Sequence, residues 1–188
     1  MQISSEHNSL KVLKHIVFGV QAAFVLTMAF ESCNTPDKEE FDWNGGKVWL
    51  DRKNDTLSFI RYSKDGEIVA SQRLPWPVYR FTYGDLDCDS IPEVAVGVIK
   101  ETYYWKQMDR RLFIYQIYKD QHIVPLWLGS HVASELMDFK IDRGTQPALV
   151  RTIERRKDSS LYEAEYYLSK FGLKFKRYIN ENATKKHY

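Results

Sequence analysis

Cysteine is scarce in this chain of 188 residues, which contains only Cys33 and Cys88. Two cysteines cannot supply the four ligands of a structural zinc site, and they cannot form a framework of several disulfides. Cys88 lies between Asp87 and Asp89, and carboxylates beside a thiol oppose formation of the nucleophilic thiolate. We therefore interpret Cys88 as a small loop residue rather than as a catalytic nucleophile.

A large excess of one charge is also absent. Lys and Arg number 27 against 25 Asp and Glu, which gives a net charge of +2, and no long basic block occurs. Proteins that bind nucleic acids cluster basic side chains on one face to neutralise phosphates. The sequence therefore predicts no nucleic-acid partner.

The residues of common catalytic centres are sparse as well. The chain has five histidines, and neither a Ser-His-Asp arrangement nor an H-x-x-x-H pair can be recognised. We interpret His131, which follows a Gly-Ser turn, as a structural residue. The sequence therefore favours a protein that is not an enzyme.

An apolar run long enough to span a membrane comfortably is missing. The longest apolar run covers residues 16–30, IVFGVQAAFVLTMAF. A run of this length is short for a membrane span but has the length of the apolar part of a signal peptide. Lys11 and Lys14 precede it, as basic residues do in signal peptides. An N-terminal signal helix is therefore expected here.

The apolar run is followed by Glu31-Ser32-Cys33, which resembles the bacterial lipobox in the relaxed form of the Bacteroidetes. The resemblance implies that residues 1–32 are a lipoprotein signal peptide, that Cys33 is acylated, and that its lipid attaches the protein to a membrane. An uncleaved N-terminal anchor helix, or a signal peptide cleaved before Cys33, would be the alternatives.

We expect residues 33–46 to form an acidic linker, because four carboxylates occur between residues 37 and 42. An acidic cluster just after the lipid-bearing cysteine resembles the surface-export signal of Bacteroidetes lipoproteins. The resemblance implies a lipid-anchored protein of the bacterial outer membrane, exposed at the cell surface.

The body of the chain, residues 47–180, alternates strand-like segments with turn signals such as Asp65-Gly66, and residues 181–188 form a polar tail. Strands are expected at residues 47–52, 56–63, 67–74, 78–85, 93–101, 111–119, 122–129, 135–142, 148–156, 162–169 and 173–179. The expected class is all-β with antiparallel strands. The strands fall into three groups, too few to close a ring of propeller blades, so a β-sandwich or an incomplete propeller is expected.

The stretch GDLDCDSIPE carries the most chemical information in the sequence. Asp85, Asp87 and Asp89 occupy positions 1, 3 and 5 of a loop, with Ile91 at position 7 and Glu93 at position 9. Calcium takes six to eight oxygen ligands, and alternate positions of a loop can direct oxygens to one point. The alternative is a solvated polar turn in which Asp side chains bind nearby backbone amides.

Residues 83–98, YGDLDCDSIPEVAVGV, resemble the FG-GAP or VCBS type of repeat, in which a D-x-D-x-D-G loop is followed by an apolar strand. The resemblance implies a Ca²⁺ ion held by the carboxylates at positions 1, 3, 5 and 9 and by one backbone carbonyl. The implied ligands are Asp85, Asp87, Asp89, Glu93 and the carbonyl of Ile91. Ser90 stands where the repeat carries glycine.

The runner-up function is a carbohydrate-acting enzyme, or a glycan-binding accessory protein. Glycoside hydrolysis needs two carboxylates in different environments, whereas the acids of one short loop share one environment. Acids elsewhere could complete such a site, but no spacing selects a pair among them. These acids are Glu101, Glu135, Asp138 and Glu154.

Aromatic residues are concentrated at Tyr103, Tyr104 and Trp105 and again around Trp76. Exposed Tyr and Trp side chains bind sugar faces or anchor protein partners, so the first cluster is a candidate binding surface for a glycan or a protein. The alternative is that these rings cap the sheet. The expected function is thus a lipid-anchored, non-catalytic binding or structural module of the cell envelope.

Overall fold

The structure is a computed structural model that describes residues 38–103, 106–129 and 132–180. The expected signal peptide, Cys33 and the polar tail lie outside the described residues. No helix within these ranges has the length and apolar character needed to cross a bilayer.

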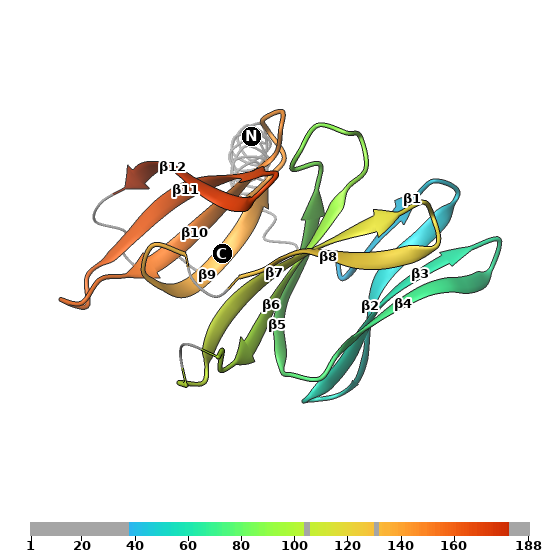
Figure 1. Ribbon diagram of the computed structural model, residues 1–188, viewed down its shortest axis with the longest axis horizontal. Coiled ribbons are helices and arrows are strands. Elements are labelled where there is room, and N and C mark those ends of the chain that lie inside the picture. Colours follow the sequence, from blue (N-terminus) through green and yellow to red (C-terminus); the bar gives the residue numbers. More distant parts are fainter. Residues whose placement is uncertain (1–37, 104–105, 130–131, 181–188) are drawn as a thin grey trace, which may run out of the picture. The chain divides into compact units, whose positions relative to one another are not determined.

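The described residues form three antiparallel sheets of four strands each, which confirms the predicted all-β class (Figure 1). The first sheet has the order β1-β2-β3-β4, the second β5-β6-β7-β8, and the third β12-β11-β10-β9. The first sheet contains β1 (Glu40–Trp43), β2 (Gly46–Asn54), β3 (Leu57–Lys64) and β4 (Glu67–Leu74). The second contains β5 (Val78–Gly84), β6 (Glu93–Lys100), β7 (Asp109–Tyr118) and β8 (His122–Leu128). The third contains β9 (Glu135–Asp142), β10 (Leu149–Arg155), β11 (Leu161–Ser169) and β12 (Gly172–Asn180).

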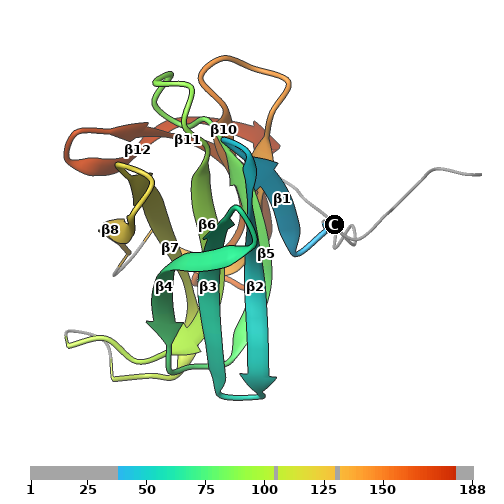
Figure 2. The same ribbon diagram turned by 90° about the vertical axis from the view of Figure 1, so that its right-hand side faces the viewer.

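Within each sheet, strands that follow one another in the chain pair with one another, so each sheet is a simple meander (Figure 2). The β3–β4 turn is Asp65-Gly66, whose φ angles of +52° and +84° are those of a type I′ hairpin turn. Within β3 the inward-facing Ser58, Ile60 and Tyr62 are buried and alternate with half-buried residues, as the period of two predicted.

Strand β1 lies inside the segment that the sequence analysis assigned to an acidic linker. Phe41 is buried, Trp43 packs beside it against the core, and the turn Asn44-Gly45 connects β1 to β2. The acids of this segment, such as Glu40 and Asp42, occupy the alternate positions that face solvent. The four acids favoured a linker in the sequence. The strand forms because Phe41 and Trp43, at alternate positions, pack against the core.

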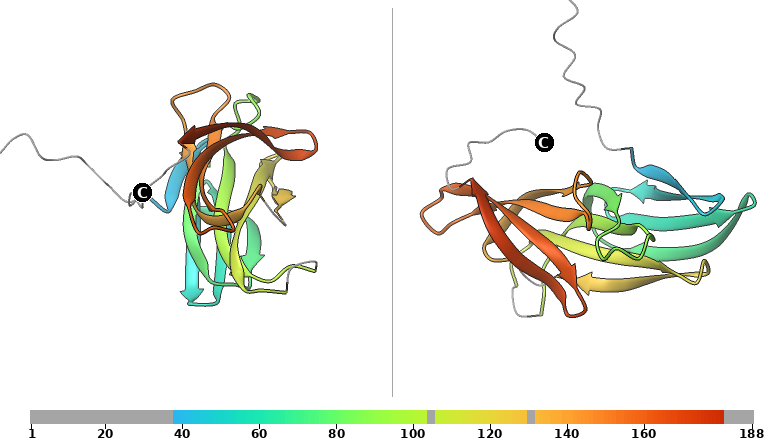
Figure 3. Two further views of the ribbon diagram at one scale, coloured as in Figure 1. Left: turned by 90° about the vertical axis from the view of Figure 1, so that its left-hand side faces the viewer. Right: turned by 90° about the horizontal axis from the view of Figure 1, so that it is seen from above.

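The second sheet lies between the first and the third, and it is buried on both faces (Figures 1 and 3). Strand β6 illustrates this arrangement, since all residues from Glu93 to Val98 are buried. Val94, Val96 and Val98 face the first sheet, whereas Ala95 belongs to the core shared with the third sheet. Two cores between three successive meanders form the open, propeller-like arrangement rather than a two-sheet sandwich.

Candidate metal centre

The acidic loop, defined here as residues 85–92, connects β5 to β6. The last residue of β5, Gly84, is paired with the first residue of β6, Glu93. A Cβ atom on Gly84 would lie 2.6 Å from Cγ2 of Ile141 in β9, so glycine permits the third sheet to approach closely. Leu86 is completely buried in the core between the second and third sheets and anchors the loop there.

Three aspartates converge in this loop. Each of Asp85, Asp87 and Asp89 has a carboxylate oxygen within 4.8 Å of the others. The carboxylates also accept backbone hydrogen bonds inside the loop: Asp85 Oδ2 from Ser90 N at 3.1 Å, and Asp89 Oδ1 from Ile91 N at 2.7 Å. The structure thus contains elements of both expected forms, the convergent oxygens of a cation site and the amide contacts of a polar turn.

The backbone of the loop takes the left-handed conformation twice, at Cys88 (φ +66°) and at Ser90 (φ +68°). For a residue other than glycine this conformation costs about 1–2 kcal/mol. Ser90 therefore adopts a left-handed backbone conformation at the position where the FG-GAP or VCBS type of repeat carries glycine. Cys88 is exposed, and desolvation together with the charges of Asp85 and Asp87 raises the pKa of its thiol.

Glu93 is the buried member of the set. Its side chain has no solvent exposure, Oε2 accepts a hydrogen bond from Leu86 N at 2.7 Å, and Oε1 has no hydrogen-bond partner. Burial raises the pKa of Glu93 to about 8, the Leu86 amide opposes this change, and the neighbouring aspartates add to it. Glu93 is not one of the three residues whose oxygens lie within 4.8 Å of one another.

The carboxylates of Asp85, Asp87, Asp89 and Glu93 form no salt bridge with a Lys or Arg side chain within the part of the chain that the structure describes. The neutral amide of Gln116 donates to Asp89 Oδ2 at 3.3 Å, and Oδ1 of Asp85 is buried without a partner. A hard cation with oxygen ligands fits this donor set, because it would supply the missing positive charge and would bind to the unpaired oxygens.

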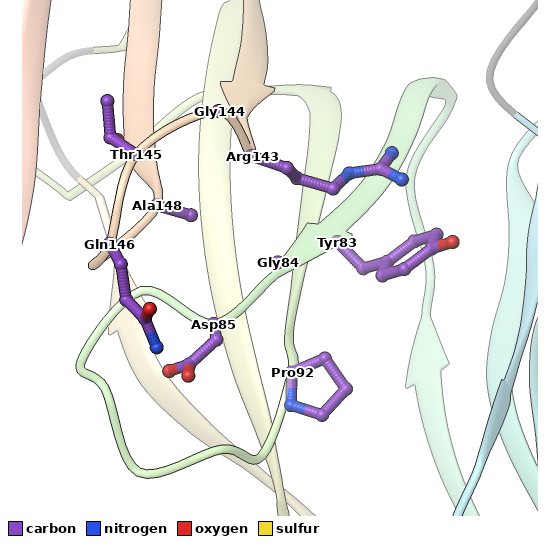
Figure 4. A pocket seen from close by; sticks show the side chains of 9 residues that line it. All are labelled: Tyr83, Gly84, Asp85, Pro92, Arg143, Gly144, Thr145, Gln146 and Ala148. Atoms are coloured by element: carbon purple, nitrogen blue, oxygen red, sulfur yellow. The ribbon is translucent and has the colours of Figure 1, made fainter.

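A cavity of about 430 Å³ borders the loop, lined on one side by Asp85 and Pro92 and on the other by the β9–β10 connection (Figure 4). Ala148 N donates to Asp85 O at 2.8 Å and holds the two loops together. The side chains of Gln146 and Asp85 extend toward each other in this cavity, while Arg143 lies over the Tyr83 ring at 4.2 Å (Figure 4).

Two of the other acids considered in the sequence form ion pairs with arginine. Glu135 pairs with Arg155, Asp138 pairs with Arg80, and Glu101 is exposed. None of these three carboxylates belongs to the cluster formed by Asp85, Asp87 and Asp89 in the described residues.

Glu154 has a role that the sequence analysis did not identify. It is completely buried, and its oxygens accept hydrogen bonds from Tyr162 Oη at 2.7 Å, Tyr166 Oη at 2.6 Å and Ser134 N at 2.6 Å. The spacing of the two tyrosines on β11 could have indicated this network, because residues i and i+4 of a strand share a face.

The aromatic candidates are only partly described. Tyr103 is 81% exposed, whereas Tyr104, Trp105 and His131 lie outside the described residues. Tyr103 lines a second cavity together with Trp76, so the structure unites two aromatic segments that the sequence analysis treated separately.

Comparison of the chain with family models, with curated proteins and with solved structures gave no match. The likeness to the FG-GAP or VCBS repeat therefore rests on residues 83–98.

Proposed function

We propose that the chain is a lipid-anchored, non-catalytic binding or structural module of the bacterial cell envelope, and that its acidic loop holds a calcium ion. One observation carries the calcium proposal: Asp85, Asp87 and Asp89 converge within 4.8 Å, while the adjoining Glu93 is buried with one oxygen unpaired. Deeply buried carboxylates without a partner are rare in stable proteins, because the desolvation of the charge is unfavourable.

Calcium suits the loop better than smaller or softer cations do. It accepts six to eight oxygens with flexible geometry, and carboxylates and backbone carbonyls are its usual ligands. Asp85, Asp87, Asp89 and Glu93, with the carbonyl of Ile91, would supply this oxygen-only set. A bound cation would also favour the ionised form of Glu93 and offset the repulsion among the four carboxylates.

Burial of Glu93 supports a non-catalytic role. Glycoside hydrolysis needs a protonated carboxyl group that reaches the substrate, beside an ionised carboxylate. Burial raises the pKa of Glu93 to about 8, but Glu93 has no exposed surface through which a substrate could meet it. Burial, together with the charges of Asp89 and Asp85, also raises the pKa of Asp87. Asp87 has a carboxylate oxygen within 4.8 Å of those of the other two aspartates on one loop, and such convergence favours a cation site over an acid–base pair.

The lipid anchor is proposed on the sequence alone, from residues 11–33. Mass spectrometry of the chain purified from a bacterial membrane would test it, since acylation adds the mass of fatty-acyl groups to a mature N-terminus at Cys33. The same peptide without acyl groups, or starting at another residue, would contradict the anchor.

Thermal unfolding of the full chain tests the metal, with calcium or with chelator, beside a variant carrying Asp87→Asn and Asp89→Asn. A ligand at 100 times its dissociation constant adds about 2.7 kcal/mol to the free energy of unfolding, or several degrees in Tm. Calcium should raise the Tm of the parent and leave the variant unchanged.

A matched control replaces Asp55 and Asp65 with Asn; both are exposed acids in hairpin turns of the first sheet. This control removes the same charge and should retain the calcium response. If the parent unfolds at one temperature in calcium and in chelator, the acidic loop is a polar turn and the metal proposal fails.

A further inference from the structure

A second cavity, of about 330 Å³, lies where β4 of the first sheet meets β7 and β8 of the second. Its aromatic lining comes from Trp76, Tyr103, Phe113 and Tyr115. Small-molecule sites have volumes of about 300–1,000 Å³ and combine aromatic walls with a few polar groups. The cavity has both the size and the type of lining that such a site requires.

The floor of the cavity is fixed by packing. Phe113 and Tyr115 are buried neighbours on one face of β7, and Trp76 meets the Phe113 ring edge-on at a centroid distance of 5.7 Å. At the rim, Tyr103 and Leu128 are exposed, which leaves the cavity open to solvent. A rigid aromatic floor with an exposed ring at its rim favours a ligand that presents a flat apolar face.

Lys100 places a positive charge in this aromatic surrounding. Its Nζ lies 3.9 Å from the centroid of the Trp76 ring and 5.5 Å from that of Phe113. Among the described residues no carboxylate forms an ion pair with Lys100, and the nearby Asp109 instead lies 3.9 Å from Arg111. Burial, followed by the charge of Arg111, lowers the pKa of Lys100. The charge of Glu101 opposes this change, but Glu101 forms no ion pair with Lys100 among the described residues. A half-buried ammonium group that contacts aromatic rings and has no ion-pair partner attracts an anionic ligand.

Two further polar side chains, Gln72 and Thr102, line the same cavity. They offer an amide and a hydroxyl, which can both donate and accept hydrogen bonds. A purely aromatic acid would leave them without ligand contacts, whereas the hydroxyl groups of a sugar ring would use them. A phosphate would gain more from the paired donors of arginine than from the single charge of one lysine.

We propose that this cavity binds a carboxylate-bearing sugar ring, such as a uronate residue of a polysaccharide, with the carboxylate at Lys100 and the apolar face of the ring against Tyr103. This site is separate from the acidic loop. Glu93 and Lys100 stand at opposite ends of β6, which places the two sites about 23 Å apart at roughly 3.3 Å per residue. Binding here therefore does not depend on the metal.

Calorimetric titration of the full chain with trigalacturonate, its methyl ester and benzoate tests the proposal. The ester keeps the rings and removes the charge, while benzoate keeps a charge and a ring and lacks the hydroxyl groups. We expect trigalacturonate to bind at least tenfold more tightly than either, since the ester lacks the charge-assisted contact with Lys100 and benzoate lacks the hydroxyl contacts.

Two variants locate the ligand. Lys100→Met should weaken binding of trigalacturonate about tenfold or more, and Tyr103→Ala should weaken it several-fold. Tyr118→Ala is the matched control. Tyr103 and Tyr118 are both exposed and each has a lysine near its ring, Lys106 at 5.3 Å and Lys119 at 5.1 Å from the ring centroid. This variant should bind trigalacturonate as the parent does. No binding, equal binding of the acid and its ester, tighter binding of benzoate, or unchanged binding by both variants would overturn the proposal.

Discussion

The carboxylate of Glu93 accepts a hydrogen bond from the backbone amide of Leu86, 2.7 Å away, although Glu93 has no exposed surface. This contact joins the first residue of β6 to the loop that carries Asp85, Asp87 and Asp89. A buried acid is thereby held beside three exposed or half-buried ones, and the burial cost of its charge depends on pH and on any cation present.

The first prediction concerns the pH dependence of stability without calcium. Burial raises the pKa of Glu93 from 4.5 to about 8, so the folded state binds the Glu93 proton more tightly than the unfolded state. The contribution of Glu93 is therefore fully present below about pH 4.5 and is lost as the pH rises toward about 8. Urea unfolding in chelator should show this loss, and Glu93→Gln should abolish most of it.

Glu163→Gln is the control for this experiment, because Glu163 lies on β11 and outside the acidic loop. Its stability curve should follow that of the parent across the whole pH range. Parallel curves for the parent and Glu93→Gln would show that Glu93 does not titrate in this way.

The second prediction concerns the opposite pH range and the outer face of the third sheet. The buried Glu165 lies between Arg177 at 2.6 Å and Arg151 at 3.1 Å, and these guanidinium groups, Arg177 first, lower its pKa. The contribution of Glu165 to the free energy of unfolding is thus fully present at pH values above its ordinary pKa of 4.5 and is lost as the pH falls below that value, through the lowered pKa of the folded state. Arg177→Met should reduce the free energy of unfolding at neutral pH. It should also weaken the decrease in this free energy below pH 4.5, as measured by urea unfolding at a series of pH values. An unchanged decrease in this pH range would contradict the assignment.

The third prediction tests the hydrogen-bond network of Glu154. Glu154→Ala removes the acceptor for Tyr162, Tyr166 and the Ser134 amide, and each buried unsatisfied donor costs about 1–3 kcal/mol. We expect a loss of roughly 3 kcal/mol or more in the free energy of unfolding. Glu163→Ala, one strand away and partly exposed, should change it by no more than about 0.5 kcal/mol. Similar losses for both variants would exclude a special role for Glu154.

The fourth prediction concerns the approach of β9 to β5. Gly84→Ala would place a methyl group 2.6 Å from Ile141 Cγ2, and overpacking of this kind costs about 1–3 kcal/mol. Gly144→Ala, in the neighbouring β9–β10 connection, meets only Asp142 Oδ1 at 3.2 Å and should cost less. Thermal unfolding of the two variants compares them directly, and equal Tm values would indicate that the Gly84 contact is looser than described.

The all-β class could be predicted from the sequence because the period of two is local information, as in Ser58, Ile60 and Tyr62 of β3. Strand β1 was missed because its exposed acids outweighed the buried Phe41 and the Asn44-Gly45 turn. These residues do carry a strand signal, but four carboxylates in six residues are also typical of a solvated linker.

The same distinction applies to the functional features: local spacing predicts some of them, and packing between the sheets determines the others. Alternate spacing was sufficient to suggest that Asp85, Asp87 and Asp89 could converge, because one short loop holds all three. The complete burial of Glu93, the network around Glu154 and the meeting of Trp76 with Tyr103 depend on how sheets pack together. The local pattern places Tyr162 and Tyr166 on one face of β11 but does not show that both donate to Glu154.

Strand β6 is hydrogen-bonded to β5 on one side and to β7 on the other, and both of its faces are covered. Its amide protons can reach water only when neighbouring sheets separate, so their exchange with deuterium should report the global unfolding of the domain rather than local opening. The two proposed sites are attached to the opposite ends of this strand. Each is thus supported by a strand whose amides stay protected until the sheets separate.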